Sequence, residues 1–165
     1  MAARFFIEGT HAAGERVVFD DADAHKILHV LRLRDRDPVE VFDSSSRAFL
    51  ARLAVDGSRV AAELGEPVEA AEGVGPAITV AQGIPKGRKM DFIVEKLSEL
   101  GAFELLPLAS ARAIAEAGDV KRTRWSRLAK TAAQQCGRRS VMRIGDQITV
   151  ETLAERCAGY DAVLV

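Results

Sequence analysis

A stretch from Lys121 to Arg143 concentrates positive charge in a chain that is otherwise balanced. It contains eight lysine and arginine residues and no Asp or Glu, whereas the whole chain has 23 Lys and Arg against 24 Asp and Glu. One-sided charge of this kind favours a polyanionic partner, although a solvated basic helix face is an equally common explanation. Trp125 and the segment Gln134–Arg139 add an aromatic face, amide groups and a glycine turn, which together are typical of nucleic-acid recognition. The cations are Lys121, Arg122, Arg124, Arg127, Lys130, Arg138, Arg139 and Arg143.

A second group of cations lies in the loop Gln82–Lys89, directly after a predicted buried strand at residues 77–81. The loop contains Lys86, Arg88 and Lys89. Ligands of parallel sheets bind at the carboxyl ends of the strands, so the loop is well placed to contact one. Its spacing does not match a phosphate-binding P-loop, because no Ser or Thr follows the lysine. We expect this loop and the Lys121–Arg143 stretch to form one continuous basic surface.

Metal-dependent and nucleophilic chemistry find little support in the sequence. His25 and His29 are spaced as a pair on a predicted helix, but no third ligand is evident and the glutamate of a zinc-protease motif is absent. Cys136 and Cys157 form no CxxC pair, so we expect free thiols. No Ser/His/Asp order indicates a triad, although the linear order does not exclude a spatial one.

Composition bounds the class of protein. The chain has 165 residues, of which 48% are apolar, and this is ordinary for a globular protein. No window approaches the roughly 18 apolar residues needed to span a bilayer. Glu8 comes too early for a secretory signal. We therefore expect a cytosolic protein without a membrane segment.

Residues 1–70 predict a small β-rich domain. Short apolar strands are separated by tight turns, with Asp56-Gly57 as a strong hairpin signal, and this pattern favours a compact barrel or a curled sheet. Asp20 and Asp21 suit the start of a helix that carries Ile27, Val30 and Leu31 at helical spacing. The strands are expected at residues 4–7, 17–19, 39–42, 48–55 and 59–64, and the helix at residues 22–33.

A Gly- and Pro-containing linker at residues 71–76 precedes a second domain at residues 77–165. Strand and helix patterns alternate there, which predicts an α/β layer fold with parallel strands. The final segment 161–165 has the pattern of a buried strand. We expect either that the chain is the front portion of a longer protein or that a partner subunit covers this strand. Strands are expected at residues 77–81, 103–106 (stopped by Pro107) and 161–165, and helices at 90–100, 121–134 and 150–157.

Several segments together resemble the bacterial 16S ribosomal RNA uridine N3-methyltransferases, a family of the SPOUT class. The pieces Lys96–Gly101 and Gln135–Arg138 are the most specific, because neither is demanded by helix or strand patterning. Gln134 stands where members of that family often have Glu. The segments are Arg4–Phe6, His25 with Val30–Arg32, Lys86–Met90 with Glu95–Gly101, Pro107, Arg112, and Trp125 through Arg138.

The resemblance implies a PUA-like N-terminal β-barrel that grips RNA and a C-terminal α/β domain with a trefoil knot that binds S-adenosylmethionine. It also implies a homodimer that methylates N3 of a uridine in the 16S rRNA of the small ribosomal subunit. The knot segments of the family lie beyond Val165, so we expect no cofactor-binding residues among those present. The 165-residue chain alone is expected to be inactive and to bind the cofactor only when that segment is restored.

The resemblance also suggests roles for individual residues. Arg138 would stabilise the charge that develops on the uridine, and Gln135 would read the edge of the base. Other cations would hold RNA, and no metal is required. The open alternatives are a non-catalytic RNA-binding module and a small-molecule α/β enzyme with an incidental basic face. The expected RNA contacts are Arg4, Arg32, Lys86, Arg88, Lys89, Arg112, Arg124 and Arg139.

Overall fold

The computed structural model describes residues 3–68, 75–109 and 118–165. The chain forms two compact units. The first contains Met1–Val74 together with Gln134–Ser140, and the second contains Gly75–Ala133 and Val141–Val165. The predicted linker at residues 71–76 lies mostly outside the described residues. The assignment of residues 134–140 to the first unit was not predicted from the sequence.

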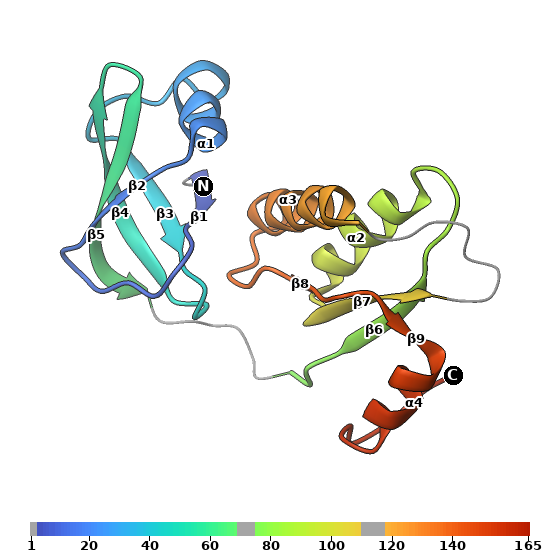
Figure 1. Cartoon of the computed structure of the whole chain (residues 1–165). Coiled ribbons are helices and arrows are strands. Elements are labelled where there is room, and N and C mark those ends of the chain that lie inside the picture. The colour runs from blue at the N-terminus through green and yellow to red at the C-terminus, as the bar shows by residue number, and fades with distance from the viewer. Residues whose placement is uncertain (1–2, 69–74, 110–117) are drawn as a thin grey trace. The chain divides into compact units, whose positions relative to one another are not determined.

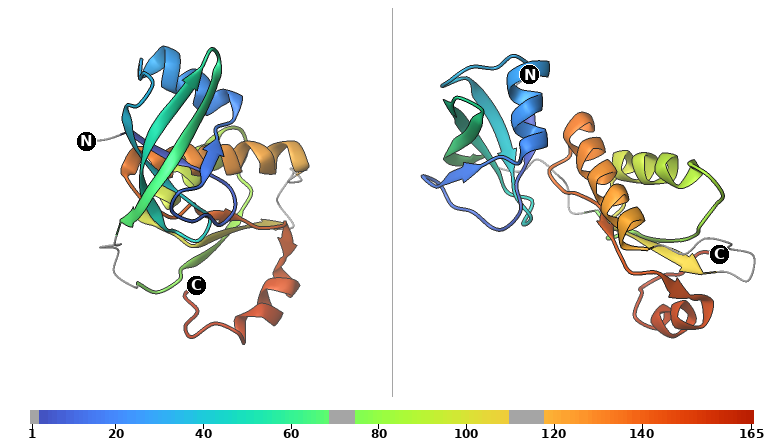
Figure 2. Two further views of the ribbon diagram at one scale, coloured as in Figure 1. Left: turned by 90° about the vertical axis from the view of Figure 1, so that its left-hand side faces the viewer. Right: turned by 45° about the horizontal axis from the view of Figure 1, so that its top comes forward.

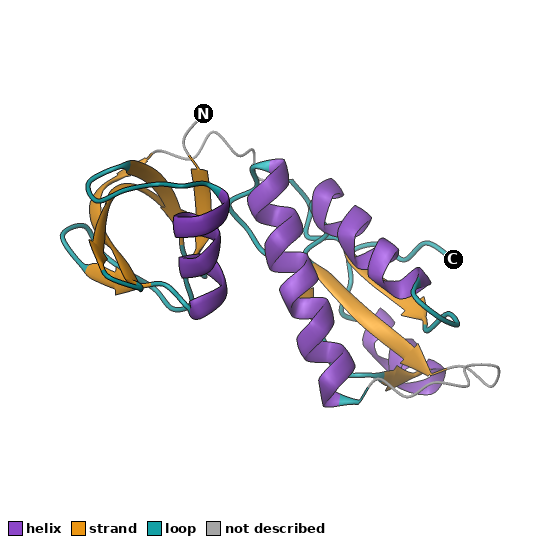
Figure 3. Cartoon of the chain, turned by 90° about the horizontal axis from the view of Figure 1, so that it is seen from above, coloured by secondary structure: helices purple, strands orange, loops and turns teal. Residues whose placement is uncertain are grey.

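The first unit is built on one curled five-stranded sheet (Figures 1 and 3). The strand order is β1-β3-β4-β5-β2, so β1 and β2 are its two edges. The pair β1–β3 is parallel and the other pairs are antiparallel. This confirms the predicted β-rich unit as a curled sheet. The strands are β1 (Ala3–Phe6), β2 (Arg16–Val18), β3 (Pro38–Phe42), β4 (Ala48–Asp56) and β5 (Arg59–Val68).

The core of this unit lies inside the curl of the sheet. Phe5, Ile27, Val41 and Phe49 are fully buried there. Each completely buried large side chain of this type contributes roughly 1.5–3 kcal/mol of hydrophobic stabilisation. The predicted hairpin at Asp56-Gly57 is confirmed, and it joins β4 to β5.

A bulge between β4 and β5 requires a glycine. The strand register shifts between Phe49 and Ala51. A Cβ atom at Gly65 would lie 2.6 Å from the backbone oxygen of Leu50, a distance that no side chain tolerates. The glycine therefore allows the two strands to bend around the core.

The helix of the first unit begins as predicted but changes pitch. Asp20 caps α1 (Asp21–His25), its Oδ1 accepting a 2.8 Å hydrogen bond from the backbone N of Asp23. The chain then continues as a π-helical turn, η1 (Lys26–Val30), in which Leu31 N donates to Lys26 O at 2.9 Å. The wider turn changes which residues face the sheet. Ile27 is buried as predicted, whereas the prediction that Val30 and Leu31 are buried is wrong, since both are exposed.

The second unit contains a small parallel sheet with two helices on one face. The strand order is β6-β7-β8, and β9 also pairs with β7. In Figures 1 and 2, α2 and α3 cover one face, and α4 follows β9 away from it. The mixed α/β architecture with parallel strands is thus confirmed. The elements are β6 (Thr79–Gly83), α2 (Lys89–Leu100), β7 (Glu104–Ala109), α3 (Asp119–Cys136), β8 (Arg143–Ile144), β9 (Ile148–Thr149) and α4 (Val150–Cys157).

Two strand predictions in this unit are wrong. Strand β7 continues through Pro107 instead of stopping there. The proline is tolerated because β8 pairs with β7 only as far as Leu105 and β9 begins pairing at Leu108. Residues 161–165 form no strand, since no neighbouring strand pairs with them and Leu164 is almost fully exposed.

The helices follow their predicted ranges, with differences in which residues are buried. In α2, Met90 and Val94 are buried, but Leu100 is exposed at the C-terminal end. Gly101 caps α2 with a φ of 84°, a left-handed conformation that favours glycine. Thr149 caps α4, its Oγ1 accepting a hydrogen bond from Thr152 N at 3.2 Å.

Candidate nucleic-acid interface

In the first unit, two of the predicted RNA-contacting arginines share one carboxylate. Arg4 Nε donates to Glu40 Oε2 at 3.0 Å, and Arg139 Nε donates to Glu40 Oε1 at 3.2 Å. Glu40 is 9% exposed. The Arg4 guanidinium also donates to the carbonyl oxygen of Gly137. The pairing with one carboxylate fixes the orientation of both guanidinium groups.

A second polar contact in this unit involves Lys26 and Gln134. Lys26 Nζ lies 5.6 Å from the centre of the Phe5 ring and donates to Gln134 Oε1 at 3.2 Å. Gln134 is buried, and its Nε2 has no hydrogen-bond partner among the described residues. The amide oxygen of Gln134 thus accepts a hydrogen bond from the Lys26 ammonium group without adding a negative charge at this position.

The remaining predicted site residues of the first unit lie in different environments. Gln135 is exposed in the last turn of α3, and Arg138 is half-buried two residues beyond the end of that helix. Both belong to the segment 134–140, with Arg139. Arg32 is exposed and has a φ of 55°, in the left-handed region.

In the second unit, the predicted basic loop lines a pocket with α3. The pocket has a volume of about 470 Å³ and lies at the carboxyl end of β6. Lys86 and Arg88 come from the loop, whereas Lys121 and Arg124 come from α3. The structure therefore brings part of the loop and part of the basic stretch together. The remaining lining residues are Ile84, Pro85, Gly87, Met90, Asp91 and Trp125.

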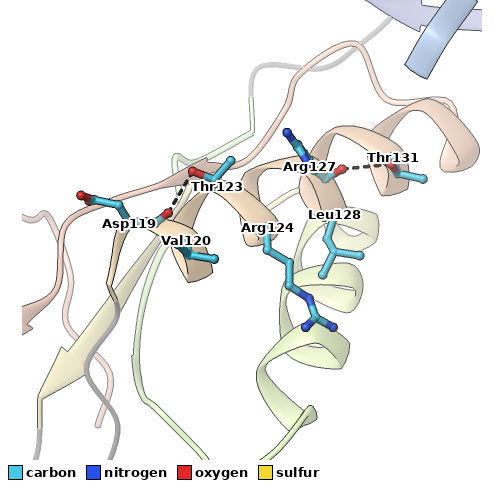
Figure 4. A pocket seen from close by; sticks show the side chains of 7 residues that line it. All are labelled: Asp119, Val120, Thr123, Arg124, Arg127, Leu128 and Thr131. Carbon is cyan, nitrogen blue, oxygen red and sulfur yellow. Dashed lines mark hydrogen bonds between the residues drawn. The ribbon is translucent and has the colours of Figure 1, made fainter. Parts of the chain in front are cut away.

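A neighbouring, more open pocket of about 650 Å³ runs along α3 (Figure 4). Arg124 and Leu128 extend to one side of the helix in this view, and Arg127 points to the other. The hydroxyl groups of Thr123 and Thr131 donate to the carbonyl oxygens of Asp119 and Arg127, each at 2.9 Å. These hydroxyls are therefore engaged with the helix backbone.

The predicted uninterrupted cationic patch requires correction. Arg122 pairs with Asp146, and Arg124 pairs with Asp91. Arg139 pairs with Glu40, as described above. Carboxylates from other elements thus neutralise part of the charge that the linear stretch concentrates.

The prediction that Trp125 provides an exposed stacking face is wrong. The residue is 3% exposed and belongs to the core between α3, α2 and the sheet. Its spacing with Ala129 and Ala132 places all three on the buried side of α3. The tryptophan packs the helix, and the basic residues occupy the other faces.

Two predicted contacts lie outside these clusters. Arg112 is outside the described residues. Lys89 is exposed at the first residue of α2 and does not line the pocket. The rings of His25 and His29 are in contact at an interplanar angle of 47°, with their centres 4.8 Å apart. Across residues 3–68, 75–109 and 118–165, no group of three or more His, Cys, Asp or Glu could hold a metal ion. No described helix combines the length and apolar character that a membrane crossing requires.

Sequence reasoning missed the carboxylates that organise both clusters. Glu40 lies in the apolar run Val39–Phe42, and a charged residue within a buried strand was the available signal. Asp91 lies in the first turn of α2, where acidic residues are common because they interact favourably with the helix dipole. Its pairing with Arg124 therefore could not be predicted from the sequence.

The fold and site define a mixed α/β protein with cationic clusters in both units and a basic pocket at the carboxyl edge of parallel strands. The chain belongs to the RNA methyltransferase domain family, which it matches over residues 74–165. It is 29% identical over 172 residues to Ribosomal RNA small subunit methyltransferase E of Bacillus subtilis, with 98% of this chain aligned to 66% of that protein. The protein of the same name from Synechocystis is 28% identical, with 99% of this chain aligned to 54% of its length. The family resemblance drawn from the sequence is thereby confirmed.

Solved structures give the same relationship. The Neisseria gonorrhoeae Ribosomal RNA small subunit methyltransferase E, bound to S-adenosyl methionine, superposes with a TM-score of 0.83 and 28% identity, covering 93% of this chain and 64% of that one. A putative methyltransferase from Legionella pneumophila, in complex with the same cofactor, superposes with a TM-score of 0.83 at 21% identity. The superposition covers 99% of this chain and 69% of that one. The latter likeness concerns the fold alone. The chain spans between about half and two thirds of the length of the curated relatives described above.

Proposed function

We propose that the protein containing this chain transfers a methyl group from S-adenosylmethionine to N3 of a uridine in the 16S rRNA of the small ribosomal subunit. The observation that carries the proposal is the match along nearly the whole chain to Ribosomal RNA small subunit methyltransferase E, together with the family match over residues 74–165. The solved neighbour of the same name that is bound to S-adenosyl methionine supports the choice of cofactor.

The first unit is proposed to be a PUA-like RNA-binding barrel. Its five strands curl around a single core, which supports a barrel-like shape, although β1 and β2 remain edges of the described sheet. The paired arginines Arg4 and Arg139 give it a net cationic cluster beside Glu40. We further propose that the second unit of the chain is the front part of a SPOUT domain with a trefoil knot, as the sequence resemblance implies. The same resemblance supports a cytosolic homodimer.

The reaction needs acid–base and electrostatic help. Uridine N3 carries a proton at neutral pH, so methylation requires removal of that proton and stabilisation of the negative charge on the base. S-adenosylmethionine supplies an electrophilic methyl group when bound. The protein must therefore orient the base, exclude water and stabilise the developing anion.

Residues of the segment 134–140 are proposed for these tasks. Arg138 is half-buried, and a guanidinium in a partly desolvated position stabilises an anion better than one in bulk water. The exposed amide of Gln135 can donate to and accept from the edge of a uracil ring. Arg32 and the basic pocket of the second unit are proposed to contact the RNA backbone.

Neither of the two pockets described above suits the cofactor. S-adenosylmethionine carries a sulfonium cation, and the pocket at β6 has four cationic side chains against one carboxylate. The open pocket on α3 shares Arg124 with that pocket and is lined by one further arginine, Arg127. We therefore assign no cofactor contact to these residues.

A methyl-transfer assay tests the proposal. The natural polypeptide that contains this sequence would be incubated with small ribosomal subunits, naked 16S rRNA and S-adenosylmethionine labelled on the methyl group. Digestion to nucleosides should show the label in 3-methyluridine. RNA binding without transfer would support a non-catalytic RNA-binding module, and transfer to another nucleoside would refute the proposed position.

A further inference from the structure

The pocket at the carboxyl end of β6 is strongly cationic for its size. Lys86, Arg88, Lys121 and Arg124 line it together with one carboxylate, Asp91, so the lining residues carry a formal charge of +3. The chain as a whole has a net charge of −1, so this concentration is local. Such a lining favours an anionic ligand and disfavours a cationic or apolar one.

We propose that this pocket seats a backbone phosphate of the bound RNA, and that Asp91 limits its affinity by holding Arg124. RNA is named as the source of the phosphate because the inference rests on the proposed function. The pocket itself, its cations and the pairing of Asp91 with Arg124 are properties of the second unit alone.

Backbone geometry at the loop supports a phosphate ligand. Helix α2 begins at Lys89, and the residue before it, Arg88, makes no side-chain capping bond. The N–H of Asp91 donates to the carbonyl oxygen of Arg88 at 3.1 Å. The N-terminus of the helix carries a partial positive charge, which adds to the attraction of the four cations. Gly87 has a φ of 70°, which lets the chain turn between Lys86 and Arg88. Both of these side chains are exposed and can approach a ligand from solvent.

The floor of the pocket is rigid and apolar. Ile84, Met90 and Trp125 are each less than 10% exposed and belong to the core of the unit. A fixed floor holds the loop and α3 at a constant separation. Phosphate binding then orders only the flexible ends of the basic side chains, which lowers the entropy lost on binding.

Asp91 has a specific place in this arrangement. Its carboxylate pairs with the Arg124 guanidinium, and the aspartate side chain is 21% exposed whereas that of the arginine is 54% exposed. The pair keeps Arg124 beside α2 and cancels one positive charge. Replacing the carboxylate with a neutral amide should therefore free a cation for the phosphate and remove a repulsive charge.

The pocket is tested by RNA binding to loop variants. Fluorescence anisotropy with a labelled single-stranded RNA from the small-subunit rRNA would measure Kd for the full protein over a series of salt concentrations. Lys86→Ala and Arg88→Ala should each weaken binding uniformly across sequences and reduce the slope of log K against log salt by about 1. The matched control is Arg156→Ala, an exposed arginine on α4. If the loop variants behave like this control, the pocket does not bind RNA phosphate.

The role of Asp91 is tested by two charge-matched variants. Asp91→Asn should tighten RNA binding roughly fivefold, the effect of removing one repulsive charge about 4 Å away in a water-like dielectric. Asp146→Asn releases Arg122, another α3 arginine, without altering the pocket lining. It should change Kd by less than about twofold, because an exposed charge at a distance is screened by salt. Equal effects of the two variants, or weaker binding by Asp91→Asn, would overturn the proposed role.

A competition experiment identifies the source of the phosphate. Inorganic phosphate, added at constant ionic strength, should displace the RNA poorly because it lacks the neighbouring phosphates that an RNA backbone supplies. Strong displacement would identify free phosphate as the ligand and overturn the assignment to RNA. The methyl-transfer assay is independent of this result. Transfer without any effect of Lys86→Ala or Arg88→Ala would leave the proposed function standing and remove only the pocket.

Discussion

At the scale of single residues, several arginines form ion pairs with the protein's own carboxylates, and a linear charge pattern does not reveal these pairs. Arg4 and Arg139 are 135 positions apart in the sequence, yet both bond to Glu40. Residue type alone indicated that these arginines meet anions. Only the fold shows that one of the anions is the protein's own carboxylate.

Replacement of Glu40 by glutamine should destabilise the first unit. The Glu40 side chain is 12% exposed, and two guanidinium groups bond to its carboxylate; the side chain of one of them, Arg4, is 27% exposed. Removing one partner of a largely buried ion pair leaves uncompensated charge, and we expect a loss of about 2–3 kcal/mol in the free energy of unfolding. Hydrogen exchange of the sheet amides would measure the loss. Glu63→Gln, at an exposed position of β5, should cost less than about 0.5 kcal/mol.

Arg138 is the residue on which the proposed chemistry depends. Arg138→Ala should lower the rate of methyl transfer about 100-fold or more, the usual effect of removing a group that stabilises an anionic transition state. RNA affinity should fall much less, because one phosphate-type contact is a small part of a polyanionic interface. Arg127→Ala, an exposed arginine on α3, is the matched control. Equal losses of rate and affinity in Arg138→Ala would leave Arg138 as an RNA contact without a catalytic role.

At the scale of elements, the turn between β3 and β4 is fixed by a buried aspartate. Asp43 has a fully buried side chain and accepts hydrogen bonds from the backbone N of His11 at 3.0 Å and from Ser45 Oγ at 2.6 Å. Burial alone would raise the pKa of Asp43, but these bonds together hold the pKa below its usual value. The stability that they provide is present above pH 3.8 and is lost as the pH falls through the lowered pKa.

His11 should make the stability of the same region decrease with rising pH. Its Nε2 lies 2.9 Å from the carbonyl oxygen of Glu8 and its Nδ1 lies 2.8 Å from Glu15 Oε2. The contact with the Glu8 carbonyl raises the pKa of His11, burial opposes this, and Glu15 raises it further. The folded-state pKa lies above 6.5, so the contribution is complete below pH 6.5 and is lost as the pH rises through the raised pKa.

Thermal unfolding of His11→Gln measures this contribution. Between about pH 5.5 and about pH 8.5, where histidines titrate, the wild-type protein should lose more of its thermal stability than the variant does. Glu15→Gln should show a pH dependence weaker than that of the wild-type protein but still present, because the Glu8 carbonyl contact remains. Parallel pH profiles for the wild-type protein and His11→Gln would show that this histidine does not couple to folding.

The elements themselves were largely predictable, because their signals are local. Asp20 capping α1, Asp56-Gly57 turning the β4–β5 hairpin and Gly101 ending α2 each act within a few residues. The errors have non-local causes. Pro107 is tolerated because of where β8 and β9 pair, and residues 161–165 lack a neighbouring strand. Neither cause is visible in the segment concerned.

At the scale of the whole chain, the basic stretch Lys121–Arg143 is divided between two units. Residues 134–140 belong to the first unit, and the remainder of the stretch belongs to the second. The sequence predicted the charge but not this division, because helical periodicity runs through α3 without interruption. The two cationic clusters can therefore be tested separately, Arg4 and Arg139 in the first unit and Lys86 and Arg88 in the second.

The identity of the methylated nucleoside tests the central claim most directly. The gene that encodes this sequence would be deleted in its source organism, and nucleosides from 16S rRNA would be analysed by mass spectrometry before and after complementation. We predict that 3-methyluridine disappears on deletion, returns with the wild-type gene and stays absent with Arg138→Ala. Unchanged 3-methyluridine in the deletion strain would contradict it.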